Sequence, residues 1–240
     1  MVRKSLCLLS VATLLLLAAG EVRAGGVGLF GSYGEGSVSA KRDSDGGRYE
    51  FDQDASHAGI GLVYDTNVLE AKPWSWRVAL GYEKMDLDVD GGDGPFTDGL
   101  GSDYKGRLFL ENDLGYGKKA GSRVRLWGGA TTRLSFYTGN DDGHGGSRDQ
   151  KVFGAGIGPV AGVNVGITDS VAISFKGGYL LSYYSGRWSD WTSPLADKSR
   201  EDMTATEGNW FLNVAILFKT GDLNWGDEEE LGDPEKKDDF

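Results

Sequence analysis

The chain has a single cysteine, Cys7, among its 240 residues. Cys7 lies in an N-terminal segment with a basic start at Arg3 and Lys4, a leucine-rich apolar run and the small residue Ala24 at its end. This pattern predicts a secretory signal peptide over residues 1–24. Cys7 would leave with that leader, so we expect neither a disulfide nor a cysteine-based metal site in the rest of the chain.

Beyond the leader the sequence also lacks long apolar runs and an excess of positive charge. No apolar run is long enough for a membrane helix, and the mean hydropathy is negative. Without residues 1–24, which carry three of the 25 basic residues and one of the 36 acidic ones, the formal charge is −13. This balance argues against nucleic acid as a partner, because phosphate binding needs a positive field.

Glycine and aromatic residues are abundant, with 39 Gly, 7 Trp, 10 Tyr and 10 Phe. The segment 123–137 places apolar side chains at even positions and arginines at odd positions. The apolar ones include Val124, Leu126, Leu134 and Phe136, and the arginines are Arg123, Arg125 and Arg133. A helix would scatter these arginines, whereas the period of two in a strand puts them on one face. The segment therefore predicts a long strand with one apolar and one polar face.

Seven further segments alternate in the same way. The eight predicted strands cover 26–38, 59–65, 76–83, 104–116, 123–137, 153–167, 171–184 and 210–219. The connections alternate between long polar loops (41–57, 91–103, 139–150 and 185–207) and short turns, which is typical of an antiparallel meander. We therefore predict an all-β, eight-stranded antiparallel up-and-down transmembrane β-barrel over residues 25–220. A water-soluble ligand-binding barrel is the alternative fold, but it would need an apolar interior.

Two places break the regular alternation. After Lys84 the apolar residues move from even to odd positions, which indicates either a bulge or a strand that has left the bilayer. Pro159 interrupts an otherwise regular strand and cannot donate a ladder hydrogen bond, so we expect a local bulge there.

The apolar alternation of 208–218, which ends in Phe218, is similar to the C-terminal signal of substrates of the barrel-assembly machinery. In architecture the chain resembles the small eight-stranded outer-membrane barrels of Gram-negative bacteria, the class of the outer-membrane protein A transmembrane domain and its OmpX-like relatives. The resemblance implies a location in the outer membrane, contact with its lipid and lipopolysaccharide, and recognition by the barrel-assembly machinery. We expect a monomer, and a disordered acidic periplasmic tail over 221–240.

The polar face of the central strands carries the candidate site. It is a predicted cluster of charges inside the barrel: Arg77, Glu83, Lys105, Arg107, Glu111, Asp113, Arg123, Arg125 and Arg133, with Asp65 and Lys176 on nearby strands. An eight-stranded barrel is just wide enough for side chains to fill, which favours a packed ionic plug. The alternative is a gated polar pore in which the ion pairs exchange partners.

The long loops are the second candidate site. Tyr49, Phe51, Phe96, Trp188 and Trp191 lie there among charges and glycines. Aromatic side chains are common at recognition sites, and they are equally common in loops that only pack over a barrel mouth. An acidic surface would favour a basic or cation-bridged partner.

Signals for catalysis or metal binding are weak. His57 and His144 are the only histidines, and we expect both in solvated outer loops without a fixed serine and carboxylate. Asp86, Asp88 and Asp90 resemble the opening of a calcium loop, but Thr97 stands where the bidentate glutamate belongs. We therefore expect no catalytic site, no cofactor and no specific metal site. The leading functional hypothesis is a structural or adhesin-like surface role; the alternatives are a small solute channel and a lipid-modifying enzyme.

Overall fold

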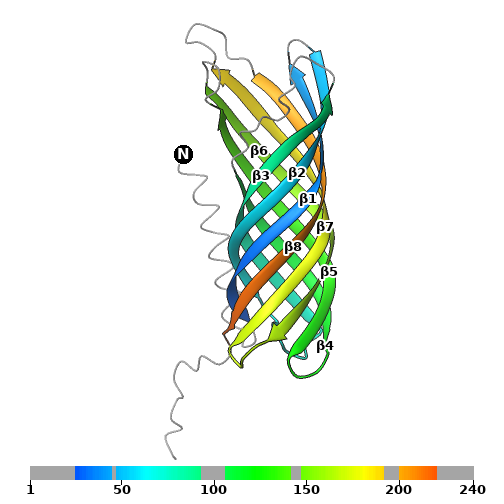
Figure 1. The fold of residues 1–240 in the computed structure, drawn as a ribbon, viewed down its shortest axis with the longest axis vertical. Coiled ribbons are helices and arrows are strands. Elements are labelled where there is room, and N and C mark those ends of the chain that lie inside the picture. Colours follow the sequence, from blue (N-terminus) through cyan, green and yellow to red (C-terminus); the bar gives the residue numbers. More distant parts are fainter. Residues whose placement is uncertain (1–24, 45–46, 93–105, 142–146, 192–199, 221–240) are drawn as a thin grey trace, which may run out of the picture.

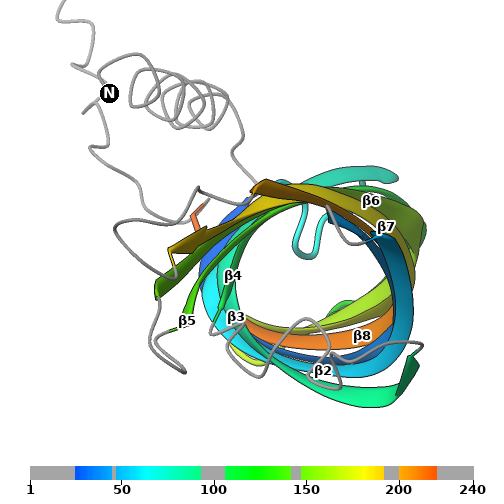
Figure 2. The same cartoon turned by 90° about the horizontal axis from the view of Figure 1, so that it is seen from above.

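The computed structural model describes residues 25–44, 47–92, 106–141, 147–191 and 200–220. These residues form β1 (Gly26–Ser44), β2 (Gly47–Asp65), β3 (Trp74–Gly92), β4 (Arg107–Lys119), β5 (Val124–Asp141), β6 (Ser147–Gly166), β7 (Val171–Trp191) and β8 (Arg200–Lys219). Each strand pairs antiparallel with its neighbour along the chain, and β1 pairs with β8. The sheet therefore closes into a barrel (Figures 1 and 2), which confirms the predicted fold class.

The two ends of the barrel differ. Tight turns join β2 to β3, β4 to β5 and β6 to β7 at the end where β1 begins and β8 finishes (Figure 1). We call this the lower end and the opposite one the upper end. No helix among the described residues is long and apolar enough to cross a membrane. The expected leader (1–24) and acidic tail (221–240) lie outside these residues.

The outer wall carries a band of exposed apolar side chains. On β8 its members are Trp210, Leu212, Val214, Ile216 and Phe218, each between 41% and 56% exposed. Aromatic pairs mark its edges: Tyr33 and Trp210 stack edge to face at the upper edge, with ring centroids 5.8 Å apart. Trp74 and Tyr116 do so at the lower edge, at 5.4 Å. An apolar belt with aromatic rims on a barrel without free edges is suited to a lipid bilayer.

Beyond the upper edge of this band the strands run much further than the sequence indicated. Ser44 of β1 pairs with Gly47 of β2, so the predicted long loop 41–57 is wrong. The predicted loops 139–150 and 185–207 are likewise largely strand, because β5 ends only at Asp141, β7 ends at Trp191 and β8 begins at Arg200. These segments look loop-like in sequence because their outward side chains face water and are polar, as at Asp52, Asp54 and Asp202.

The move of the apolar residues from even to odd positions in β3 has the same cause, namely that water covers the outer wall there. Lys84 and Asp86 point outward and Met85 points inward, yet the pairing of β2 with β3 is unbroken from Gln53–Val89 to Asp65–Arg77. A bulge after Lys84 is therefore wrong, and the strand has instead left the apolar band. The register shifts only further up, between Asp52 and Gln53.

Pro159 does not produce the expected bulge. The pairing of β6 with β7 stops after Ile157–Leu181 and resumes at Val160–Gly178 in the same register. On its other side Pro159 pairs regularly with Ala130 of β5. The missing N–H thus interrupts the ladder locally without shifting it.

Candidate functional site

The interior of the barrel holds most of the predicted charge cluster. Seven of its members are at most 3% exposed: Arg77, Glu83, Arg107, Glu111, Asp113, Arg125 and Arg133. Arg123 was placed wrongly. It precedes β5, is exposed, and its Nη1 donates to the carbonyl oxygen of Ile167 at 3.2 Å, because alternation orients side chains only within the strand. Lys105 lies outside the described residues.

Arg107 of β4 is the centre of the upper part of this network. Its Nε donates to Glu83 Oε2 at 2.8 Å. Its Nη1 donates to the hydroxyls of Tyr137 at 2.8 Å and Tyr184 at 3.1 Å. The same nitrogen reaches Glu207 Oε2 at 3.1 Å, and Tyr184 donates its own hydroxyl proton to Glu207. Strands β3, β4, β5, β7 and β8 are thereby connected across the lumen.

Arg133 of β5 joins this upper part to a second group of charges. It donates to Glu111 Oε2 from Nε at 3.0 Å and from Nη2 at 2.7 Å, and its Nη1 lies 3.3 Å from Glu83 Oε2. Lys176 of β7 bonds the other oxygen of Glu111 and donates to Asp113 Oδ2 at 2.9 Å. The network is thus continuous from Glu207 to Asp113.

Aromatic rings cover the faces of these cations. The guanidinium of Arg133 lies 4.4 Å from the ring centroid of Phe109 and 5.4 Å from that of Phe211. Lys176 Nζ lies 5.3 Å from the Phe211 centroid. A cation with carboxylates at its edge and rings over its face has little room for water, which strengthens its ion pairs.

Two members of the network were not anticipated. His57 and Glu207 are at most 2% exposed, and His57 Nε2 lies 2.6 Å from Glu207 Oε1. The expectation of a solvated loop histidine at position 57 is therefore wrong, because β2 extends past it and its odd positions face inward. Counting in steps of two beyond Gly59 and Asn209 would have placed both residues inside. His144 lies outside the described residues.

The buried charges balance. Among the described residues the buried acids are Asp65, Glu83, Glu111, Asp113 and Glu207, and the buried bases are Arg77, Arg107, Arg125, Arg133 and Lys176, with His57 in addition. Five of each sign in one enclosed space allow every charge a partner of opposite sign nearby. That arrangement limits the cost of desolvation, which a surplus of either sign would raise steeply.

One apolar cluster lies above the charges and another lies among the lower ones. The upper apolar cluster consists of Val38, Ala40, Ala55, Met85, Tyr137, Val152, Tyr184, Met203 and Ala205. The lower apolar cluster consists of Phe30, Val63, Val68, Ala79, Phe109, Ala172, Ala215 and Leu217. Charged and apolar groups thus alternate along the lumen.

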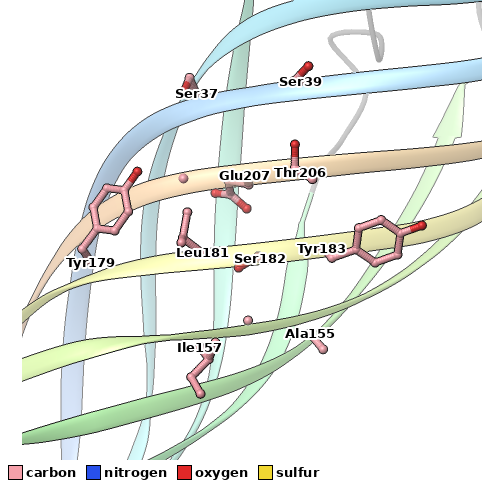
Figure 3. A pocket seen from close by; sticks show the side chains of 12 residues that line it. Ser37, Ser39, Ala155, Ile157, Tyr179, Leu181, Ser182, Tyr183, Thr206 and Glu207 are labelled. Atoms are coloured by element: carbon pink, nitrogen blue, oxygen red, sulfur yellow. The ribbon is translucent and has the colours of Figure 1, made fainter.

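The outer wall has a groove of about 740 Å³ over β1, β6, β7 and β8 (Figure 3). Tyr179, Leu181 and Ile157 on its rim belong to the apolar band, whereas Ser37 and Thr206 lie on the polar wall above it. The groove therefore straddles the upper edge of the band.

The other predicted site residues do not form a loop surface. Tyr49 and Phe51 lie in β2, and Trp188 and Trp191 lie in β7, so the prediction that these residues stand in loops is wrong. The structure describes only the backbone at these four positions, and Phe96 lies outside the described residues.

The aspartates of the calcium-like motif lie in strand β3. Asp86 is exposed and pairs with Lys84 at 3.3 Å. Asp88 and Asp90 follow in the same extended strand, which is not the tight turn of a calcium loop. The described residues hold no group of three or more potential metal-ligating side chains.

The fold defines the chain as a small outer-membrane-type β-barrel. No protein-family model and no curated protein matches it. Among solved structures it is similar to the outer membrane protein OprG from Pseudomonas aeruginosa, with a TM-score of 0.50, 12% identity, and coverage of 83% of this chain and 99% of OprG. At this identity the similarity is one of fold.

Weaker similarities fall in the same class. Neisserial surface protein A matches with a TM-score of 0.32 and 15% identity over 77% of this chain and 96% of its own. Ail, the attachment invasion locus protein of Yersinia pestis, matches with a TM-score of 0.31 and 15% identity over 79% of this chain and 98% of its own.

Proposed function

We propose that this protein resides in the outer membrane, with its upper end outside the cell, and serves as a closed, rigid platform for surface interactions. The tight turns would lie in the periplasm, as short turns do in barrels of this class. The proposal is adhesin-like in kind and includes no enzymatic activity.

The observation that carries the proposal is the reversal of polarity above the apolar band, where polar side chains point outward and apolar ones point inward. There the outer wall is polar, with Ser37, Ser39 and Lys41 outward on β1, while Val38 and Ala40 point inward into the upper apolar cluster. At about 3.3 Å per residue and a tilt of ~45°, the part of β1 above Tyr33 rises roughly 20–25 Å from the band. A structural barrel of the bilayer alone has no need of such a packed projection.

The projecting wall also indicates the chemistry of a partner. Its exposed side chains include Glu35, Asp54, Asp86 and Asp202. Lys41 donates a hydrogen bond to Glu50 at 2.8 Å, which lowers the pKa of that carboxyl and keeps it ionised. An acidic wall favours a basic partner or one bridged by divalent cations.

The filled lumen supports this role over a solute channel. Passage would require the Arg107–Glu83 and Arg133–Glu111 pairs to part, and breaking a buried ion pair typically costs about 3–5 kcal/mol. A catalytic role for His57 has equally little support. Its side chain is bonded to Glu207 beneath the upper apolar cluster, where no lipid or protein substrate could reach it.

The same geometry indicates how the barrel would meet membrane lipid, a second copy of itself and the barrel-assembly machinery. Outer-membrane lipid and lipopolysaccharide would surround the apolar band and contact the wall above it. Within the apolar band every strand is paired on both sides, so this part of the barrel has no free edge to recruit a second copy, which supports a monomer. The closing strand β8 would present the barrel-assembly signal.

The test combines adhesion with conductance. Outward residues Glu35, Asp52 and Asp54 are replaced by serine, which leaves the inward apolar side chains intact, and Glu70 and Asp169 at the lower end are replaced by serine as the control. We expect vesicles carrying the wild type and the control to adhere to a surface coated with a basic protein, and vesicles carrying the upper variant to adhere less. In planar bilayers we expect no steady conductance. Unchanged adhesion together with discrete channel openings would refute the proposal.

A further inference from the structure

One of the three tight turns folds back into the barrel. In Figure 2 the turn between β2 and β3, drawn in turquoise, lies inside the ring of strands. Asn67 and Val68, in the first half of this turn, are at most 1% exposed. In contrast, Gly121 in the β4–β5 turn and Asp169 in the β6–β7 turn are exposed.

The turn is held in shape by Asn67. Its side-chain Nδ2 donates to the carbonyl oxygens of Lys72 at 2.6 Å and Trp74 at 3.0 Å. Its Oδ1 accepts from the backbone N–H of Glu70 at 3.1 Å, and its own N–H donates to Asp65 Oδ1 at 2.9 Å. One side chain therefore fixes both ends of the turn.

The inner wall of the barrel holds the turn in place through hydrogen bonds and close packing. Asn164 of β6 donates to the carbonyl oxygen of Val68 at 2.9 Å, and Arg125 of β5 donates to that of Pro73 at 3.1 Å. Two glycines leave room for its side chains. A Cβ at Gly26 would lie 2.7 Å from Val68 Cγ2, and one at Gly166 would lie 2.6 Å from Leu69 Cδ1.

Above the turn the inner wall carries buried polar atoms without a partner among the described residues. They include Arg77 Nε, Asp113 Oδ1, Thr131 Oγ1 and Asn213 Oδ1. Asp113 stands directly between Arg77 and Thr131 across the strand ladders, and Lys176, which bonds Asp113, is the ladder partner of Asn213. Buried polar atoms in native proteins are almost always satisfied, and water is the partner that remains to them.

We propose that the polar layer around Arg77, Asp113 and Thr131 in the lower half of the lumen is a hydrated vestibule, and that the turn formed by residues 66–73 is its removable stopper. When the turn swings out, water and small ions of either sign enter from the lower end, because Arg77 and Asp113 give the vestibule both charges. The Arg133–Glu111 pair and the upper apolar cluster stop them from passing further. The stopper is held by two apolar side chains and by hydrogen bonds to backbone carbonyl oxygens, one of them from the Arg125 guanidinium. None of these contacts pairs opposite charges, so the turn opens more easily than the ion pairs above it.

The sequence allows a clean accessibility test, since Cys7→Ser removes its only cysteine. In that background Thr131→Cys reports on the vestibule, Val152→Cys on the upper apolar cluster, and Asp169→Cys on a fully exposed turn. The folded protein in vesicles is treated with a small, charged methanethiosulfonate, and the rates of thiol modification are compared. Asn67→Ala is then added to each variant to release the turn.

We expect Thr131→Cys to react more slowly than Asp169→Cys, and ~10-fold faster once Asn67→Ala is present, because modification tracks the population of the open form. Val152→Cys should stay unreactive in both backgrounds. Leu69→Ser removes the apolar side chain that lies against Gly166 and leaves the backbone hydrogen bonds of the turn intact. It gives a second release variant if Asn67→Ala does not fold.

Three results would overturn the inference. Thr131→Cys that stays unreactive after release would mean that the vestibule is dry. An equal rate in both backgrounds would mean that the turn is no stopper. A parallel rise at Val152→Cys would mean that the whole barrel opens. The first two results leave the closed barrel and adhesion through the upper wall untouched, whereas the third would also contradict the closed platform, so failure of the vestibule and failure of the proposed function can be told apart.

Discussion

Replacing Arg133 by methionine tests whether the interior network is a sealed ionic plug. Arg133 is 1% exposed and contacts both Glu111 and Glu83, so the substitution leaves two buried carboxylates without this cation. Uncompensated buried charge of this kind costs about 3–5 kcal/mol. Because Lys176 still bonds Glu111 and Arg107 still bonds Glu83, we expect the lower end of that range, ~3 kcal/mol.

A second substitution separates the loss of the ion pair itself from the cost of leaving a buried carboxylate without its partner. Adding Glu111→Met to Arg133→Met removes one charge of each sign, and Lys176 keeps Asp113 at 2.9 Å. The double variant should therefore recover to within about 1–2 kcal/mol of the wild type, because apolar replacement of a whole buried pair is often nearly neutral. Arg123→Met is the matched control, an exposed arginine whose loss should cost under ~0.5 kcal/mol.

The assay is reversible urea unfolding of the barrel in lipid vesicles, followed by tryptophan fluorescence. The slope with urea should be the same for all variants, so that midpoints report stability alone. A loss below about 1 kcal/mol for Arg133→Met would mean that water already screens the pair, and the sealed plug would be wrong. A double variant less stable than the single one would refute the charge-balance reasoning.

Five more substitutions, at four positions, test the wall and one turn by the same unfolding assay. Val214→Arg, in the middle of the apolar band on β8, should lower the free energy of unfolding by about 2–4 kcal/mol. Leu126→Arg, close to the lower end of β5, should lower it by only about 0–1 kcal/mol. Equal losses would contradict the placement of the band. Gly121→Ala should cost about 1–2 kcal/mol because φ is 95° there, and Gly121→Asn should be milder. Gly154→Ala would bring a Cβ to 2.1 Å from the Tyr184 ring and should cost about 1–3 kcal/mol by displacing it; no measurable loss would mean that the ring is not fixed.

Much of the barrel followed from the sequence because period two is a local signal. The alternation of Leu126 with Arg125, or of Leu212 with Asn213, needs only neighbouring residues to show which side chains share a face. A charged face also identifies the lumen, since charge is far costlier in lipid than inside a polar interior. Strand order, face and most of the charge cluster were therefore within reach.

The sequence misled where the solvent outside the barrel changes. Above the lipid band water covers the outer wall, so outward residues such as Lys84 and Asp86 are polar and the apolar ones, such as Met85, turn inward. Such a polar segment resembles a loop in sequence, and the predicted loops that contain His57 and Glu207 are wrong for this reason. Only the pairing of β1 with β2 and of β7 with β8 reveals these segments as strand.

The sequence by itself determined the number of strands, the face that each presents and the presence of charge inside. Only the tertiary structure decided which charges meet, because closing the sheet brings together residues as distant as Arg107 and Glu207, whose contact depends on the register and tilt of every strand between them. It also decided that the turn formed by residues 66–73 folds inward. Its seat consists of Gly26, Asn164 and Gly166, which are remote in sequence and come together only when the barrel closes.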